Sequence, residues 1–345
     1  MAQTQVAQGW DVLGLGNAIV DVIAEADEAL LGTLDLAKGT MTLIDAARMR
    51  SLYAAMGPAI EMSGGSCANT MAALASLGGR SAYVGKVQRD QLGEIFGHDI
   101  RATGVAFSTP PLDGGPATAR CLVLVTPDAQ RTMATYLGAC VELGLDDIDE
   151  AAVAASRITY LEGYLWDRPG AKQACLKAAG LAHRHGREVA LTLSDPFCVD
   201  RWRGEFARLI EAHVDILIAN EAEITSLYQT RHFADAVERV RGSCRIAALT
   251  RGPAGSVILA EGAVHEIAPA PVERVVDSTG AGDLYAAGLL YGLTHGLTAA
   301  ASGRLASLCA ATILGQLGAR AEHPLAPLVA RVGPDQRSNQ KVSGR

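Results

Sequence analysis

The sequence predicts a three-layer α/β fold, in which helices cover both faces of a mostly parallel sheet, with a second, smaller β-sheet beside it. Apolar runs rich in β-branched residues recur along the chain, and Ala/Leu-rich segments with helical spacing lie between them. Such alternation is typical of a parallel sheet that is buried on both faces. Residues 17–45 and 113–140 interrupt it with shorter strand patterns, and these predict the small sheet.

The strands of the large sheet are expected where the apolar runs are longest. These runs lie at residues 11–16, 157–163, 187–194, 214–220 and 245–251. Helices are expected between most of them, for example over residues 169–185 and 204–212. In such sheets ligands bind beyond the carboxyl ends of the strands, so an active site is expected at that edge.

The small sheet is predicted from two excursions out of this pattern. The first holds DVIAE and GTMTLID, and the second holds ARCLVLVT and RTMATYL, which the turn at residues 127–130 joins into a β-hairpin. We expect the two segments to meet as a lid, formed by residues 17–45 and 113–140. A nucleotide- and substrate-binding body is then expected to comprise residues 10–16, 46–112 and 141–332, and residues 1–9 and 333–345 are expected to be disordered tails.

Composition excludes several classes of protein. The net charge is −7, from 30 basic against 37 acidic residues, and no basic run is present, which argues against a nucleic-acid partner. The 7 cysteines are odd in number and never spaced C-x-x-C, so neither a disulfide framework nor a zinc ribbon is expected. Unpaired cysteines are typical of a reducing compartment, so a cytoplasmic location is expected. No stretch approaches the roughly 18 consecutive apolar residues of a membrane span, so no membrane partner is expected.

A glycine-rich turn near the C-terminal end carries the strongest chemical signal. In VVDSTGAGDLYAAGLLYGL, Gly280, Ala281 and Gly282 can bend the chain so that backbone N–H groups converge, and the apolar spacing indicates a helix from Leu284 onward. Converging amides at a helix N-terminus bind an anion, and Asp283 would place a base beside a phosphoryl group. An ordinary Gly-rich turn with a first-turn aspartate explains the same spacing.

A second glycine pair opens an Ala-rich helix in the first quarter of the chain. Gly64 and Gly65 let the backbone approach a ligand closely, and Asn69 offers both a donor and an acceptor. Read alone, the segment is better explained by small residues chosen for packing at a helix start.

Together these segments carry a family resemblance. GGSCANT followed by ALASLGG, and DSTGAGD far downstream, resemble the two sequence motifs of the ribokinase-like (PfkB) family of sugar and nucleoside kinases, and the likeness extends over residues 10–328. Within that family the chain is most similar to the adenosine kinases of bacteria, on GNAIVDV, KGTMTLID, RTMATYLGA, YLEGYLWD and LSDPFCVDRWRGEF. The family implies a ribokinase-like α/β/α domain with a β-sheet lid, which agrees with the pattern-based prediction.

The resemblance also implies roles for individual residues at the acceptor. Asp283 would be the general base for the sugar 5′-hydroxyl, and the amides of Gly280, Ala281 and Gly282 would stabilise charge on the transferred phosphoryl group. Asp21 would accept hydrogen bonds from the ribose 2′- and 3′-hydroxyls, with the Asn17 amide orienting it. Gly64, Gly65 and Asn69 would complete the sugar site.

The resemblance places further residues around the phosphates and the base. Arg131 would reach the γ-phosphate when the lid closes, Asn220 would bind ATP, and Glu223 would hold Mg²⁺ through water. Thr250 and Gly252 stand where the family contacts nucleotide phosphates, and a K⁺ ion near the GAGD loop is a further expectation. Met133, Tyr164 and Leu165 are candidates for the wall of the base pocket.

The resemblance implies an ATP-dependent kinase that converts adenosine to AMP, as a monomer or homodimer. Two alternatives stay open: a kinase of this family for ribose, fructose or another nucleoside, and a nucleoside-binding protein without turnover. A dinucleotide-binding oxidoreductase is disfavoured, because Ile19 stands where the third glycine after Gly14 and Gly16 would be required. No P-loop motif is present.

Overall fold

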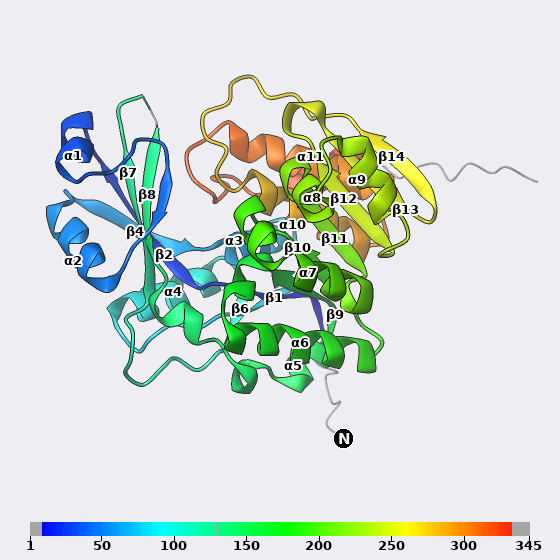
Figure 1. The fold of residues 1–345 in the computed structure, drawn as a ribbon, viewed down its shortest axis with the longest axis horizontal. Helices are drawn as coiled ribbons and strands as arrows, with labels where there is room; N and C mark the ends of the chain where they lie inside the picture. Colours follow the sequence, from blue (N-terminus) through cyan, green and yellow to red (C-terminus); the bar gives the residue numbers. More distant parts are fainter. Residues whose placement is uncertain (1–8, 129, 333–345) are drawn as a thin grey trace, which may run out of the picture.

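The computed structural model describes residues 9–128 and 130–332. The predicted tails, apart from Gly9, and turn residue Ala129 lie outside the described residues. Two sheets organise the molecule, a nine-stranded one and a five-stranded one, so the predicted fold class is confirmed. In Figure 1 the small sheet stands at the left and the large sheet with its helices fills the rest.

The large sheet is parallel over seven strands, and two antiparallel strands close one edge. All five predicted strands are present within two residues of their expected ends. Strand β10 ends early, because Ser194 has a positive φ of 70° and leaves the extended conformation. In spatial order the strands are β14 (Ala263–Ile267), β13 (Ser256–Ala260), β12 (Ile246–Thr250), β11 (Ile216–Asn220), β10 (Glu188–Thr192), β9 (Ser156–Glu162), β1 (Trp10–Leu15), β5 (Ser81–Val84) and β6 (Ala106–Phe107).

Helices cover both faces of this sheet, as buried apolar side chains on each face require. One face packs against α3 (Ser66–Ser76), α4 (Gln91–Ala102), α10 (Ala281–Thr294), α11 (Ala299–Leu314) and α12 (Ala326–Val332). The other face packs against α5 (Glu150–Ala155), α6 (Pro169–Arg184), α7 (Pro196–His213), α8 (Glu221–Tyr228) and α9 (Phe233–Val240). Helix α7 begins eight residues before the predicted start at residue 204, because Asp195 caps it and Pro196 occupies its first turn.

The small sheet has the order β3 (Met41–Leu43), β8 (Arg131–Tyr136), β7 (Ala119–Val125), β2 (Ile19–Glu25) and β4 (Ala59–Gly64). Strands β7 and β8 form the predicted antiparallel hairpin. Side chains alternate between its two faces, as the period of two in a strand requires. Val20, Val22 and Leu122 belong to the core, whereas Asp21 and Met133 line a cavity on the opposite face. Helices α1 (Glu28–Thr33) and α2 (Ala46–Ala55) complete this part of the molecule.

The expected boundary of the body is wrong at one place. Residues 46–112 were assigned to the body, but β4 pairs antiparallel with β2, and α2 packs on β7 and β8, so residues 46–64 belong with the small sheet. The sequence AIEMSG has one β-branched residue and is largely exposed at its start, so it gives little strand signal. Among the described residues, no helix is both long and apolar enough to cross a membrane.

Candidate active site

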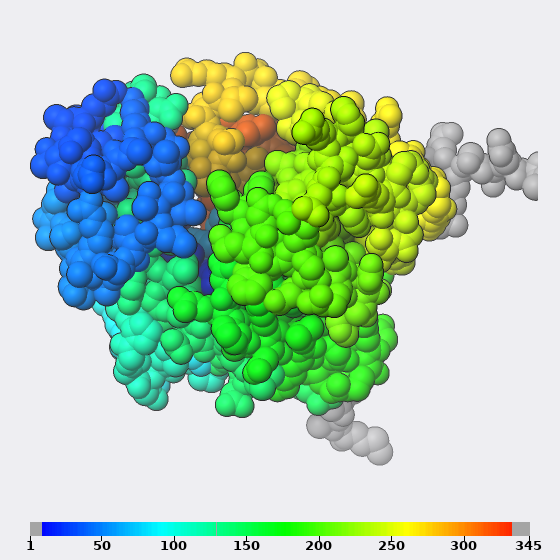
Figure 2. Space-filling view, viewed as in Figure 1, coloured from blue at the N-terminus to red at the C-terminus, as the bar shows by residue number. Residues whose placement is uncertain are grey.

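A cavity of about 840 Å³ lies between the inner face of the small sheet and the carboxyl edge of the large one. Figure 2 shows the corresponding hollow between the blue N-terminal part and the green segments. Polar residues at the ends of four adjacent parallel strands line it, namely Glu162 of β9, Thr192 of β10, Asn220 of β11 and Thr250 of β12. The site therefore occupies the edge that the strand pattern predicted.

Gly280 begins the turn into α10 and lines the cavity. Its φ of 81° is left-handed, and a Cβ atom there would lie 2.8 Å from the Cα atom of Ala319, so glycine is required on both grounds. The helix begins at Ala281, three residues before the predicted start, because Gly282 and Asp283 form its first turn without adding to the apolar pattern.

Two of the three predicted anion-binding glycine-loop residues border the cavity. Gly280 and Gly282 are among its lining residues, while Ala281 is not, and the Ala281 N–H donates to the Ser278 carbonyl at 3.2 Å. The Ala281 N–H therefore closes the turn that starts the helix, and the role expected of its amide stays a prediction.

Asp283 is partly buried where it lines the cavity, and α3 holds it. Ser66 Oγ donates to one carboxylate oxygen at 2.6 Å, and Asn69 Nδ2 donates to the other at 3.0 Å. Burial raises the pKa of Asp283, while these two hydrogen bonds and the charge of Arg320 oppose the rise. Asn69 Oδ1 is buried and has no partner among the described residues, so it remains available as an acceptor.

Asp21 reaches the cavity from β2, beside the glycine pair. A Cβ atom on Gly64 would lie 2.4 Å from Asp21 Oδ2, so Gly64 makes room for that carboxylate, although Gly64 itself does not line the cavity and Gly65 does. Burial raises the pKa of Asp21 to about 6, and the charges of Arg320 and Arg131 oppose the rise.

The predicted contact between Asn17 and Asp21 is replaced by another. Asn17 lines the cavity, but its Nδ2 donates to Glu162 Oε1 at 3.0 Å. The other oxygen of Glu162 accepts from the Cys67 N–H at 2.9 Å. The reason is topological: β1 pairs parallel with β9, which brings the residues after β1 to the end of β9. Burial raises the pKa of Glu162 to about 7.

Arg131 belongs to the cavity and not to the outer surface of the hairpin. Its side chain is 10% exposed, and its Nε lies 3.0 Å from Asp277 Oδ2, so the two form an ion pair. Burial favours protonation of Asp277, but hydrogen bonds from Thr279 and Gly318, together with the charge of Arg131, lower its pKa overall. The arginine is thus fixed beside the loop that leads into α10.

Asn220 and Glu223 form a reciprocal cap at the start of α8. Glu223 accepts hydrogen bonds from the Asn220 backbone N–H at 2.9 Å and from its Nδ2 at 2.6 Å, and burial raises the pKa of Glu223 to about 7. In the described part of the chain no three His, Cys, Asp or Glu side chains gather into a metal cluster. Since Mg²⁺ commonly keeps several waters and takes one or two carboxylates, the pair fits a hydrated Mg²⁺. Glu221 instead pairs with Arg251 at 3.4 Å.

The remaining predicted residues also line the cavity. Thr250 and Gly252 border it at the end of β12, and Met133, Tyr164 and Leu165 border it elsewhere. Further apolar side chains that the sequence did not indicate join them, including Ile19, Met41, Leu43, Val123, Leu137 and Phe197. Met41 is 49% exposed and Leu43 is 56% exposed, so the edge strand β3 presents open apolar surface.

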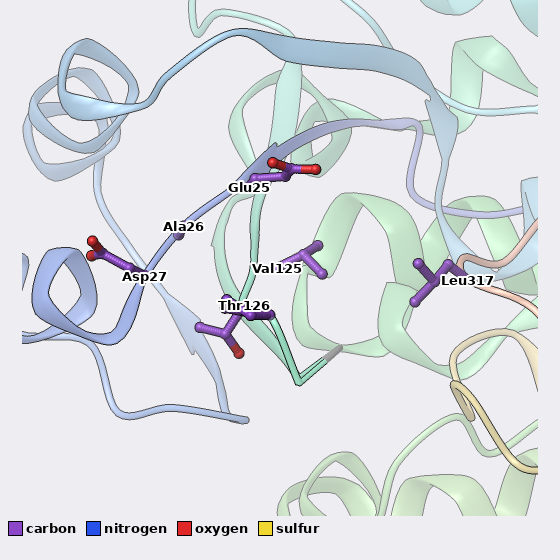
Figure 3. Close-up of a pocket in the computed structure, with 7 residues that line it drawn as sticks. Glu25, Ala26, Asp27, Val125, Thr126 and Leu317 are labelled. Carbon is purple, nitrogen blue, oxygen red and sulfur yellow. The ribbon is translucent and has the colours of Figure 1, made fainter.

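A second, open hollow of about 610 Å³ lies at the rim of the small sheet. Figure 3 shows Glu25 at the end of β2 followed by Ala26 and Asp27, Val125 at the end of β7 followed by Thr126, and Leu317 facing them from the other part of the molecule. None of the predicted site residues lines it.

Four residues of the site were missed from the sequence. Ser66 lies inside the GGSCANT motif, Asp277 lies inside VVDSTGAGD, and Glu162 lies at the end of a predicted strand. Their positions in these motifs could therefore have identified them as site residues. Arg320 lies in a Gly- and Ala-rich loop after α11, where no pattern marks it.

Comparison with known proteins gives a consistent result. The chain matches the profile described as pfkB family carbohydrate kinase over residues 60–325. It is 25% identical over 311 residues to the adenosine kinase of Saccharomyces cerevisiae, covering 82% of this chain and 88% of that protein. It is 29% identical over 250 residues to the aminoimidazole riboside kinase of Salmonella typhimurium, covering 68% and 75%.

Solved structures agree with the fold. The structure of adenosine kinase from Sinorhizobium meliloti is 51% identical, with a TM-score of 0.87, covering 94% of this chain and 100% of that one. The structure of a probable sugar kinase protein from Rhizobium etli CFN 42 is 49% identical, with a TM-score of 0.87, covering 94% and 99%.

Proposed function

Because the chain belongs to the pfkB family of carbohydrate kinases, and is therefore a phosphotransferase with an alcohol group as acceptor, we propose that it phosphorylates the 5′-hydroxyl of adenosine to give AMP. The similarity to adenosine kinases, at 51% identity for the Sinorhizobium meliloti structure, supports this acceptor. The phosphate donor implied by a kinase of this family is ATP.

A strip of apolar side chains on the small sheet is the observation that favours a nucleoside over a free sugar as the acceptor. Met41, Leu43, Val123 and Met133 line the cavity from three adjacent strands, on the same face as Asp21. A purine ring would bury the exposed surface of Met41 and Leu43, and that burial contributes about 25 cal/mol per Å². A free pentose offers hydroxyls there, which would have to give up water without gaining partners.

The polar groups beside the strip suit the ribose. Asp21 lines the cavity and would accept hydrogen bonds from the 2′- and 3′-hydroxyls, and the unpartnered Asn69 Oδ1 would accept another. Gly65 has a φ of 96° and a Cβ atom there would lie 2.2 Å from the Asn17 carbonyl oxygen, so glycine lets this turn pass close to Asn17 at the edge of the cavity, and Gly64 keeps space for the Asp21 carboxylate. Asn17 would border the sugar, held in place by its hydrogen bond to Glu162.

Phosphoryl transfer follows from the groups around α10. Asp283 takes the proton of the 5′-hydroxyl as that oxygen bonds to the γ-phosphorus, and the bond from the γ-phosphorus to the bridging oxygen breaks to release ADP. The amides at Gly280 and Gly282 and the guanidinium of Arg131 stabilise charge on the transferred group. Because the transition state is loose, positioning of Asp283 by Ser66 and Asn69 matters more than its basicity.

The donor would lie along the neighbouring strand ends. Thr250, Gly252 and Asn220 would contact ATP, and Glu223 with Asn220 would hold Mg²⁺ through water. The metal would supply charge neutralisation of the phosphates. A K⁺ ion beside the α10 loop and a cytoplasmic location belong to the same proposal, and the 7 free cysteines of the structure support a reducing compartment.

An acceptor panel tests the proposal. ADP formation from ATP and Mg²⁺ is measured with adenosine, inosine, guanosine, cytidine, 2′-deoxyadenosine, ribose and fructose, with KCl and choline chloride compared. Strong turnover of adenosine that falls with 2′-deoxyadenosine supports the adenosine proposal and the role of Asp21. Turnover of ribose or fructose alone overturns the acceptor, and adenosine binding without turnover of any acceptor indicates a nucleoside-binding protein.

A further inference from the structure

Three consecutive residues of the loop after α11 contact three different parts of the site. The Gly318 N–H donates to Asp277 Oδ2 at 3.0 Å, and Ala319 packs against Gly280 so closely that no Cβ fits between them. Arg320 Nη2 donates to both the carbonyl and the Oγ of Ser63, each at 3.1 Å. The loop therefore joins the anion-binding turn to the end of β4, where the glycine pair begins.

The guanidinium of Arg320 is shielded from solvent and has hydrogen-bond donors that are not used. Its Nε and Nη1 atoms are shielded from solvent and have no hydrogen-bond partner among the described residues. The acids whose charges act on it are Asp99 of α4, Asp21 of β2 and Asp283 of α10. Asp99 Oδ2 accepts from the Ser63 N–H at 2.7 Å, so Ser63 is held between the arginine and this acid.

Charge balance at Asp283 depends on this cation. Arg131 pairs with Asp277 and also acts on Asp21, whereas Arg320 acts on both Asp21 and Asp283. The other titratable and charged groups around Asp283 are acids, thiols or phenols: Asp21 of β2, Cys67 of α3, Tyr160 and Glu162 of β9, and Tyr164 of the 3-10 turn Gly163–Asp167. None of them can supply a compensating positive charge.

We propose that Arg320 is a positioning residue for the reaction: its buried charge keeps Asp283 and Asp21 ionised, and its bond to Ser63 fixes the glycine pair against the α10 loop. The inference rests on the proposed function only in taking Asp283 as the proton acceptor, and it holds for any alcohol acceptor that the chain phosphorylates. The opposing effect of Arg320 on the burial-raised pKa values of Asp21 and Asp283 is consistent with it.

The test uses charge-matched variants. Arg320→Gln keeps an amide donor for Ser63 but removes the charge, and Arg320→Lys keeps the charge. Removing a nearby cation raises the pKa of a carboxyl group, so Arg320→Gln should move the acidic limb of the kcat/KM pH profile upward by about one pH unit. The loss should then be about tenfold on the acidic side and shrink above the limb, whereas Arg320→Lys should retain the wild-type limb. Arg89→Gln, at a pair in which Arg89 is 63% exposed, is the control and should leave the limb in place.

Asp99→Asn provides a variant of opposite sign. It removes a negative charge that competes with Asp283 and Asp21 for Arg320, so the acidic limb of the kcat/KM profile should move to lower pH. If Arg320→Gln does not unfold cooperatively, Asp99→Asn is the variant that tests the proposal. An unchanged limb in the folded variants, or a loss by the same factor at every pH, overturns the proposal. The pH titration of the Asp283 carboxyl ¹³C resonance, assigned with Asp283→Asn, should shift its midpoint in the same direction as the acidic limb in each variant. This measurement does not depend on turnover. Failure of the kinase proposal is thus distinguishable from failure of this one.

Discussion

The Nε atom of Arg131 lies 3.0 Å from a carboxylate oxygen of Asp277, so an ion pair joins the small sheet to the loop before α10. Only 10% of the arginine side chain and 9% of the aspartate side chain are exposed. Screening by solvent is therefore weak, and each charge depends on the other. Asp277 also accepts from the Gly318 N–H at 3.0 Å, so the pair is anchored on two sides.

A double-mutant cycle measures this pair. Arg131→Met, Asp277→Asn and the double variant are compared by urea unfolding without nucleotide. Because each single change leaves a buried charge without its partner, we expect a coupling free energy of about 1 to 3 kcal/mol. A coupling near zero would show that the two residues stabilise the fold independently.

Asp283→Asn should abolish most turnover while leaving the acceptor bound. Loss of a general base typically lowers kcat by about 10² to 10⁴, and an asparagine can still contact Ser66 and Asn69. We expect kcat to fall by about 10³ and the Kd for adenosine, measured by calorimetry, to change only a few-fold. Glu221→Gln is a matched control at a half-exposed acid outside the proposed machinery. Turnover that survives in Asp283→Asn would remove the assignment of the base.

Asp21→Asn should weaken ribonucleosides selectively. A charged hydrogen bond contributes about 1.5 to 3 kcal/mol, so the KM for adenosine should rise about 10- to 100-fold, and the preference for adenosine over 2′-deoxyadenosine should narrow. Since the pKa of Asp21 is raised to about 6, adenosine affinity of the wild type should also fall as the pH drops through 6. Equal effects of the substitution on both nucleosides would contradict contact with the 2′-hydroxyl.

The buried acids of the site should make the free protein less stable at high pH. The pKa of Glu162 is about 7 in the fold against 4.5 in its ordinary state, so the folded chain retains a proton that the unfolded chain has released. This contribution to stability is fully present below about pH 4.5 and is lost as the pH rises through 7.

We expect the unfolding free energy of the wild type to fall between pH 5 and pH 8 by about 2 kcal/mol more than that of Glu162→Gln, which cannot titrate. Urea titrations of both proteins across this range provide the measurement. Parallel pH profiles for the two proteins would show that Glu162 is not protonated in the fold.

Much of this architecture is encoded locally, and the exceptions have physical causes. The β-branched runs and the glycine-rich turns predicted the strands, the carboxyl edge and Asp283, because each depends on neighbours in sequence. Strand β4 escaped prediction because its pairing with β2, not its residue types, makes it a strand. Arg320 escaped for a similar reason: its contact with Ser63 spans 257 positions, and no local pattern reports such a distance.

The contacts that hold Asp283 also set when the site can exist during synthesis. Ser66 and Asn69 precede Asp283 by 217 and 214 positions, so they leave the ribosome long before the carboxylate they hold. A nascent chain that has not yet reached α10 contains Ser66, Asn69 and Asp21, but not Asp283, the proposed base. With Asp283 as the proposed base, turnover should therefore begin only after α10 has been made and has docked against α3, and the appearance of turnover in a translation reaction would report that late docking.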